Sequence, residues 1–501
     1  MGARLRVIDV ARTTHLGHYR LVGDLAPQVD ALVASAAEVR RLSGARRVWM
    51  LNSTESGGGV AEMLPRLCSL LTELGLDARW LVLEPGDAAF FGATKALHNM
   101  LHGRAPSEPV ETIAEAVRRT SAEAATSLRS FVDSEDVLIV HDPQPAAIPG
   151  FLAPEHRPAL LWRCHVGVPF ENEHTRAAWK LLEPALAPYT RLLFSSERYV
   201  PRVLEGRSGV LQPGIDPLSH KNRELHVHKL VGVLRAADLI DGPPPPRWTQ
   251  FARGARRLTR DGWVEAPIPD FLFVPVVLQV SRFDRLKGFD VLMPAFERAL
   301  RFGAERAAHL RVDSERGESE LARTILILAG PEPAGIADDP EAARVLAELC
   351  QQWQALPDAV AARVHVVQLP MASVKENALV VNALQRSACV IAQCSLEEGF
   401  GLTVTEALWK GVPVVASNVG GLSIQVRRGT DGLLVDDPRD ADAVADALIQ
   451  QLLLRLRAEA MAASGKRRVA EHFLVITQMR RWLEEIGIVL HARAEGRGVA
   501  A

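Results

Sequence analysis

The sequence predicts an α/β fold in which two open, doubly wound sheets are joined by a connecting segment. Along most of the 501 residues, short apolar runs alternate with longer amphipathic segments, which is typical of parallel βαβ units. The alternation breaks once, near residues 221–270, and then resumes. The chain is also long enough for two large domains.

The first half of the alternating pattern predicts an N-terminal domain over 46–220. Its strands are expected at 47–51, 78–83, 136–141, 159–164 and 191–195. After the first strand, apolar residues recur with helical spacing at Val60, Met63, Leu64, Leu67, Leu71 and Leu74. Residues 1–45 are predicted to be an extension that precedes this domain.

Residues 221–270 interrupt the pattern. They contain four prolines at 243–246 and a basic cluster of Arg253, Arg256, Arg257 and Arg260. Few apolar residues recur there at regular spacing, so the segment is predicted to be a peripheral linker or insertion. A role in docking a partner is the alternative.

The resumed alternation predicts a C-terminal domain over 271–470. Its strands are expected at 274–281, 324–330, 363–368, 388–394, 412–417 and 432–435. A helix is expected after Gly288, and a last helix over 471–501 is expected to pack back on the N-terminal domain. Ligands of open α/β sheets bind beyond the carboxyl ends of the strands, so the site is expected in a cleft between the two domains.

Composition excludes several classes of protein. The formal net charge is −2, with 48% hydrophobic and 24% charged residues, which is the balance of a globular protein and argues against a nucleic-acid partner. The most apolar run, 271–280, has half of the about 20 residues that a membrane-spanning helix needs. Five scattered cysteines form no CxxC pair, so neither a disulfide framework nor a metal site is expected. A reduced, cytoplasmic location is predicted.

Three motifs could bind a phosphorylated ligand. The first is Gly57, Gly58 and Gly59, directly after a predicted strand and before a helix. Their backbone amides could approach a phosphate at the helix N-terminus, although a simple turn is equally compatible. The run is neither GxGxxG nor GxxxxGK[ST], so it predicts no dinucleotide site and no P-loop.

The second motif is SRFDRLKG at 281–288, where Arg282 and Lys287 follow a strand and precede a helix. Two cations at this position suit a diphosphate leaving group, whose negative charge grows as its bond to a sugar breaks. A pair of solvated surface cations is the alternative.

The third motif is SLEEGFGLTVTE at 395–406. Glu398 lies in a glycine-containing turn, and the amides of Phe400, Gly401 and Leu402 would face a ligand at the N-terminus of the next helix. A carboxylate in the turn could hold sugar hydroxyls, and Glu406 inside the helix could hold a ribose diol. An acidic helix start would explain Glu398 alone.

Glu398-x7-Glu406 in EGFGLTVTEALWKGVPVVAS resembles the signature of family-4 retaining glycosyltransferases, and Arg282 and Lys287 match the pyrophosphate-binding pair of that family. The resemblance implies the GT-B fold, with two Rossmann-like domains that face each other across a cleft. Further strings are similar to the trehalose glycosyltransferring synthases: LNSTESGGGVAEML, ATKALHNMLHG, VHDPQPAAIP, WRCHVGVPFEN, IDPLSHKN and QVSRFD. The likeness runs from about Arg46 to Leu490, apart from most of 223–270.

The resemblance implies transfer of glucose, with retention, from ADP- or UDP-glucose to free glucose, which gives α,α-trehalose. Arg282 and Lys287 would stabilise the departing diphosphate, Glu398 would position the donor glucose, and Glu406 would bind the ribose. His165 matches a histidine near the anomeric carbon, although an isolated histidine after a strand is more often structural. Asp142 matches an acceptor-side carboxylate, and an aspartate that starts a turn before Pro143 is its alternative.

The nucleotide sugar would be a co-substrate and the acceptor a sugar. No cofactor is then required, and Mg²⁺ is compatible but not essential. A homodimer is left open, and no nucleic acid or membrane is expected as a partner. The connector over 223–270 is longer than is usual in the family, and VPFENEHTRAAW at 168–179 also departs from the pattern, near the expected acceptor.

Three alternatives stay open. They are a trehalose phosphorylase, a glycosyltransferase that makes a trehalose analogue or a secondary metabolite, and a non-catalytic protein that binds a sugar nucleotide.

Overall fold

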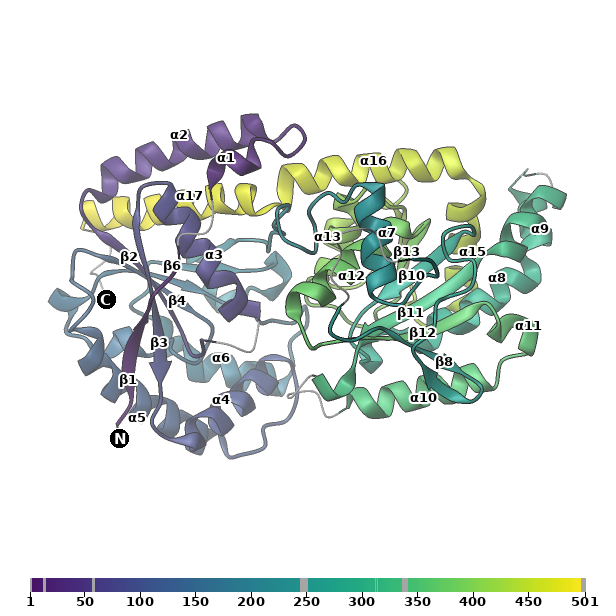
Figure 1. The fold of residues 1–501 in the computed structure, drawn as a ribbon. Coiled ribbons are helices and arrows are strands. Elements are labelled where there is room, and N and C mark those ends of the chain that lie inside the picture. The colour runs from purple at the N-terminus through teal and green to yellow at the C-terminus, as the bar shows by residue number, and fades with distance from the viewer. Residues whose placement is uncertain are drawn as a thin grey trace. The chain divides into compact units, whose positions relative to one another are not determined.

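The computed structural model describes residues 2–11, 15–55, 59–243, 251–310, 312, 314–335 and 341–496. The chain divides into two compact units (Figure 1). Unit 1 comprises Met1–Gly214 and Val475–Ala501, and unit 2 comprises Ile215–Leu474. Among the described residues, no helix is both long and apolar enough to cross a membrane.

Unit 1 is built on a seven-stranded sheet with the order β1-β3-β2-β4-β5-β6-β7. The strands are β1 (Arg4–Ile8), β2 (Arg47–Asn52), β3 (Asp77–Glu84), β4 (Val137–His141), β5 (Ala159–Arg163), β6 (Arg191–Phe194) and β7 (Ser208–Val210). All neighbours are parallel except β1, which pairs antiparallel with β3. The chain changes direction across the sheet between β2 and β4. Segments that follow these two strands therefore lie where such sheets bind ligands.

Helices cover both faces of this sheet. They are α1 (Leu16–Tyr19), α2 (Ala26–Ser43), α3 (Gly59–Glu73), α4 (Ala88–Leu101), α5 (Val110–Leu128), α6 (Glu173–Leu186) and α17 (Val475–Ala494). One buried cluster joins Leu97 of α4, Ile113 of α5 and Leu182 of α6 to Val140 and Trp162 in the strands. On the other side, α17 contacts β5, α3 and α2, and Figure 1 shows α2 running beside α17.

Unit 2 has an eight-stranded sheet with the order β15-β14-β13-β10-β11-β12-β8-β9. The strands are β8 (Arg256–Thr259), β9 (Gly262–Val264), β10 (Val276–Val280), β11 (Ile325–Pro331), β12 (Val364–Leu369), β13 (Val390–Gln393), β14 (Val414–Ser417) and β15 (Leu433–Val435). From β10 to β15 all pairs are parallel. Here the chain changes direction between β10 and β13, and this is again where a ligand is expected.

The helices of unit 2 also lie on both faces of its sheet. They are α7 (Val227–Ala236), α8 (Phe289–His309), α9 (Ser314–Arg323), α10 (Ala342–Gln354), α11 (Asp358–Ala361), α12 (Val374–Ser387), α13 (Leu402–Trp409), α14 (Leu422–Gln425), α15 (Ala441–Leu453) and α16 (Arg455–His472). Phe296 of α8, Leu346 of α10 and Leu448 of α15 share one buried cluster with Val277 and Val366 of the sheet. Helices α12 and α13 contact the strands β10 and β13.

All eleven predicted strands are present, and the prediction of two doubly wound sheets is confirmed. Four further strands, β1, β7, β8 and β9, had no signal in the apolar pattern. Residues 1–45 supply β1, an edge strand of unit 1, so the described part of this segment is integrated into the sheet rather than set before it.

The segment predicted to be a peripheral linker or insertion is an ordered part of unit 2 where the structure describes it. Its strand β8 pairs antiparallel with β12, with Arg257 opposite Val367, and β9 completes a hairpin. Arg260 reaches Asp358 at 2.9 Å and lies over the Trp353 ring. The prolines at 244–246 lie outside the described residues.

Candidate active site

In unit 2, the loop after β10 carries Arg282 and Lys287 and ends in close contact with the end of β13. The Asp284 side chain accepts a hydrogen bond from the Leu286 amide at 2.8 Å, which starts the short turn Arg285–Lys287. Gly288 then takes a left-handed conformation, with φ 66°. A Cβ atom on Gly288 would lie 1.9 Å from the carbonyl oxygen of Cys394, so only glycine fits here.

This loop brings Lys287 onto Glu398, another predicted site residue. Lys287 Nζ lies 2.7 Å from Glu398 Oε2, and the two side chains are only 18% and 11% exposed. Ser395 Oγ donates to the same carboxylate oxygen at 3.0 Å, and Gln393 Nε2 donates to Ser395 Oγ at 2.9 Å. The Glu398 carboxylate is therefore held by residues that follow the carboxyl ends of β10 and β13.

Arg282 is placed differently. Its side chain is 53% exposed, and its Nη2 lies 3.9 Å from Asp284 Oδ2. Arg282 thus lies on the same loop as Lys287, where its ion-pair partner is Asp284. The structure brings Lys287 and Glu398 together and leaves Arg282 at the surface of the loop.

The glycine turn that carries Glu398 is held by a second pair of glycines that the sequence analysis did not single out. Gly420 and Gly421 follow β14, and Gly421 donates its amide to the Glu398 carbonyl at 3.3 Å. A Cβ atom on Gly420 would lie 1.8 Å from that carbonyl oxygen, and one on Gly421 would lie 2.3 Å from Phe400 Cα. The signal was available, because two adjacent glycines lie shortly after the strand predicted at 412–417.

Phe400, Gly401 and Leu402 form the start of α13. Gly401 is left-handed, with φ 83°, and a Cβ atom there would lie 2.4 Å from Leu422 Cδ2. The Phe400 ring packs against Phe473, and Gln425 Nε2 donates to the Phe400 carbonyl. The turn is thus rigid, and the N-terminus of α13 follows it directly at the carboxyl side of β13.

Glu406 lies one to two turns into α13 and is buried, with a side chain 5% exposed. Its Oε1 is 3.1 Å from Lys221 Nζ, and its Oε2 is 3.5 Å from Gln385 Nε2. Lys410 Nζ donates to Gln385 Oε1 at 2.7 Å, and burial lowers the pKa of Lys410 to about 7. Lys221, Gln385 and Lys410 were missed by the sequence analysis, although Lys221 lies in the family string IDPLSHKN.

In unit 1, Asp142 and His165 are brought together across β4 and β5. Asp142 directly follows β4 and is left-handed, with φ 67°. Its Oδ1 accepts a hydrogen bond from the His165 amide at 2.8 Å, and its backbone carbonyl accepts one from Trp162 Nε1 at 2.9 Å. Burial raises the pKa of Asp142 to about 6, although the hydrogen bond from His165 and the charge of Arg163 oppose this shift.

His165 also contacts a second histidine. Its Nε2 lies 3.1 Å from Nδ1 of His141, and the two rings are stacked with centroids 5.4 Å apart. Burial, together with the charge of Arg163, lowers the pKa of His165 well below its ordinary value and that of His141 to about 3. Both imidazoles are therefore neutral at pH 7, so one donates and the other accepts in this contact.

Arg163, at the end of β5, is fully buried beside this pair. Its Nη2 donates to Ser195 Oγ at 3.0 Å, while Nε and Nη1 have no hydrogen-bond partner among the described residues. Burial lowers its pKa to about 10. Burial of a positive charge has a large desolvation penalty unless hydrogen bonds or negative charges compensate for it.

Of the three glycines predicted to approach a phosphate, Gly57 and Gly58 lie outside the described residues. Gly59 is the first residue of α3, which follows β2 where the chain changes direction across the sheet.

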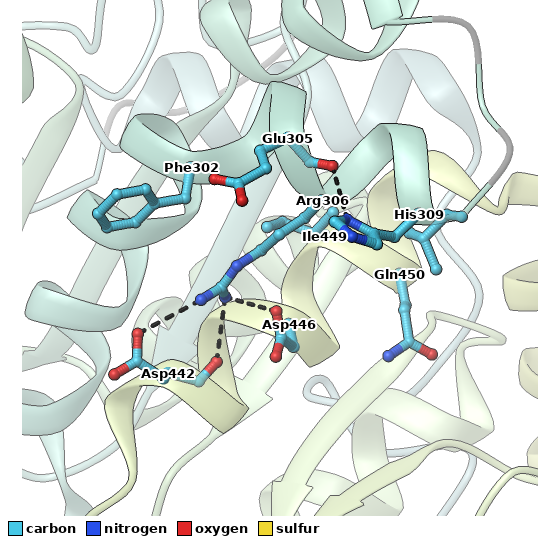
Figure 2. A pocket seen from close by; sticks show the side chains of 9 residues that line it. Phe302, Glu305, Arg306, His309, Asp442, Asp446, Ile449 and Gln450 are labelled. Atoms are coloured by element: carbon cyan, nitrogen blue, oxygen red, sulfur yellow. Dashed lines mark hydrogen bonds and ion pairs between the residues drawn. The ribbon is translucent and has the colours of Figure 1, made fainter.

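A surface groove between α8 and α15 of unit 2 is lined by none of the predicted site residues. Figure 2 shows that its central cation, Arg306, is already paired with Asp442 and Asp446.

Comparison with known proteins gives the family. The family described as "Trehalose synthase, N-terminal domain" matches residues 50–201, and "Glycosyl transferases group 1" matches residues 372–468. A trehalose synthase of Pyrococcus horikoshii is 32% identical over 442 residues, which are 87% of this chain and 88% of that protein. The chain belongs to the trehalose synthase family.

Members of this family are glycosyltransferases, so this chain is an enzyme of trehalose-related glycosyl transfer. The resemblance read from the motifs is confirmed. A trehalose phosphorylase of Grifola frondosa is also similar, with 25% identity over 80% of this chain but only 52% of that protein.

Solved structures give the fold. A UDP-forming α,α-trehalose-phosphate synthase from Burkholderia xenovorans matches with a TM-score of 0.61 at 16% identity, over 90% of this chain and 99% of that one. Both sheets with their helices are therefore those of a GT-B glycosyltransferase, as predicted.

Proposed function

We propose that this chain is a retaining glucosyltransferase that transfers glucose from ADP- or UDP-glucose to glucose and forms α,α-trehalose. The observation that carries the proposal is the Lys287–Glu398 pair, 2.7 Å apart, beside the glycine turn that starts α13. A cation, a carboxylate and a helix N-terminus at this point of the sheet suit the phosphate and sugar parts of one nucleotide sugar.

The donor phosphates would be held by cations from the loop after β10. Lys287 is oriented by Glu398 and is mostly buried, so it loses little side-chain entropy when a phosphate binds. Arg282 is more exposed and could close onto the diphosphate with its planar guanidinium. The positive charge would be worth most as the diphosphate departs, because the leaving oxygen then becomes more negative.

The chemical step would break the bond between the anomeric carbon and the diphosphate oxygen. The new bond forms between that carbon and the anomeric hydroxyl oxygen of the acceptor glucose, on the face that the diphosphate leaves. The acceptor proton passes to the departing diphosphate, so charge and atoms balance without a protein nucleophile. Glu398 would accept hydrogen bonds from hydroxyls of the donor glucose, and Glu406 would accept hydrogen bonds from hydroxyls of the ribose.

Asp142 and His165 would organise the reacting sugars. Because Asp142 Oδ1 already accepts the His165 amide, the aspartate fixes the loop on which the histidine lies. Its other carboxylate oxygen makes no hydrogen bond to a described residue and could accept a sugar hydroxyl. His165 is neutral at pH 7, so its ring can hydrogen-bond a sugar without adding a charge that would oppose a developing oxocarbenium ion.

Product analysis tests the proposal. The purified protein is incubated with ADP-, UDP- or GDP-glucose and ¹³C-labelled glucose, and the new linkage is identified by NMR. An α,α-linked disaccharide with release of a nucleoside diphosphate is expected, and E398Q is the matched inactive control. A β-configured linkage would overturn the assignment of retention.

A trehalose phosphorylase is the second candidate, because the similarity to the Grifola frondosa enzyme covers most of this chain. The protein is therefore also incubated with trehalose and inorganic phosphate. Glucose 1-phosphate formed without any nucleotide would favour this candidate over the nucleotide-dependent reaction.

A further inference from the structure

The string IDPLSHKN at 215–222 matches the family, yet none of its residues has a place in the proposed reaction. In the structure it brings Lys221 to Glu406. Lys221 Nζ lies 3.1 Å from Glu406 Oε1, and the lysine side chain is 42% exposed whereas the glutamate side chain is 5% exposed. The ion pair thus joins a buried carboxylate to a cation that reaches solvent.

The backbone on both sides of Lys221 is held in place by hydrogen bonds to α12. Asn382 of α12 donates to the carbonyls of His220 and Arg223 at 3.0 and 2.9 Å. Asn222 is 4% exposed, and its Oδ1 accepts Lys410 Nζ at 3.2 Å. The position of the lysine is therefore set by its neighbours and does not depend on its own ion pair.

Other polar groups near Glu406 hold its carboxylate less firmly. Gln385 Nε2 is 3.5 Å from Oε2, at the limit of a hydrogen bond. Lys410 Nζ is directed at the backbone carbonyl of Glu406, at 3.3 Å, and not at its carboxylate. Among the described residues, Lys221 alone forms an ion pair with Glu406.

We propose that Lys221 is a positioning residue for the nucleotide, which orients the Glu406 carboxylate toward the 2′- and 3′-hydroxyls of the donor ribose. This inference rests on the proposed function in one respect, namely that Glu406 meets the ribose. Without the lysine, the carboxylate keeps only the long contact to Gln385 and can rotate away, so the ribose hydroxyls lose a fixed acceptor. The diphosphate contacts at Lys287 do not depend on Lys221.

The test compares ribonucleotides with nucleotides that lack the sugar hydroxyls. Dissociation constants of ADP, UDP and GDP, and of the 2′,3′-dideoxy form of whichever binds, are measured by calorimetry for wild type, K221M, K221R and E406Q. K221M is expected to weaken binding of the ribonucleotide about 5- to 10-fold, as for a partly exposed charged hydrogen bond. Binding of the dideoxy form should stay unchanged, and K221R should restore most of the loss.

Two further variants separate positioning from a general charge effect. In K221M/E406Q the loss should be no greater than in E406Q alone, since both changes remove the same contact. Lys229 is exposed and forms no ion pair among the described residues, so K229M removes an equal charge and should bind both nucleotides as wild type does.

The outcomes are distinguishable from failure of the proposed function. If K221M binds both nucleotide forms with wild-type affinity, Lys221 has no such role while the glucosyltransferase proposal stands. If it weakens both forms equally, the lysine acts on the phosphates and the inference is wrong. If wild type binds none of the diphosphates, the donor assignment fails and the inference fails with it.

Discussion

Lys287 and Glu398 are 111 residues apart in sequence and form an ion pair of 2.7 Å between the loop after β10 and the turn after β13. The pair means that neither residue acts alone. Removal of the lysine leaves a mostly buried carboxylate without its counter-charge, and removal of the carboxylate frees the lysine from its fixed orientation. Both strands that carry the pair flank the point where the sheet changes direction.

Substitution of the two loop cations should lower turnover to different extents. Each charge-assisted contact to a diphosphate is worth roughly 1.5–3 kcal/mol, so K287A and R282A are each expected to reduce kcat at least ~10-fold. K287A should be the more damaging because Lys287 is mostly buried and also holds Glu398. Steady-state kinetics of the variants, with circular dichroism to show that each is folded, would support this, whereas wild-type turnover in both variants would remove the assignment.

The two glutamates should separate chemistry from nucleotide binding. E398Q keeps the size of the side chain but loses the charge beside the sugar, so kcat should fall more than nucleotide affinity. E406A should mainly weaken nucleotide binding, because its proposed partner is the ribose. Dissociation constants measured beside kcat test this division, and a fall in kcat alone for E406A would contradict it.

Activity should fall as the pH drops through about 6. Burial raises the pKa of Asp142 above its ordinary value of 3.8 to about 6, so the carboxylate is progressively protonated below that pH and ceases to be a purely accepting group. The profile of kcat/KM between pH 5 and 8 should show this acidic limb. Asparagine tolerates the left-handed backbone, so D142N should fold, have low activity and lack the limb. An unchanged acidic limb in D142N would assign it to another group.

The hairpin β8–β9 should contribute to the stability of unit 2. Leu258 in β8 is 4% exposed and belongs to the buried cluster of that unit. L258A is therefore expected to lower the free energy of unfolding by about 2–4 kcal/mol, measured by chemical denaturation. Phe273 is 77% exposed, so F273A is the matched control and should change stability by less than ~0.5 kcal/mol. If L258A and wild type are equally stable, the hairpin does not stabilise unit 2, and the prediction that 221–270 is a peripheral segment would hold.

The buried parallel strands were predictable because each is predominantly apolar. In β4 and β12, every residue is buried, and such runs are readable without knowledge of a partner. The edge strands were not predictable for the opposite reason. Arg4 and Arg6 in β1 and Arg256 and Arg257 in β8 resemble a solvated segment, and only pairing with β3 or β12 makes them strands.

The candidate site divides in the same way. The family motifs and their place after β4, β10 and β13 were readable from the sequence, since the alternation of strands and helices shows which residues follow the carboxyl end of a strand. Which of these side chains meet depends on tertiary packing. Lys221 reaches Glu406, and Gly420 packs on the carbonyl of Glu398, through contacts between segments far apart in the chain. The spacing of apolar residues along the sequence does not predict such contacts, because they depend on how whole strands and helices pack.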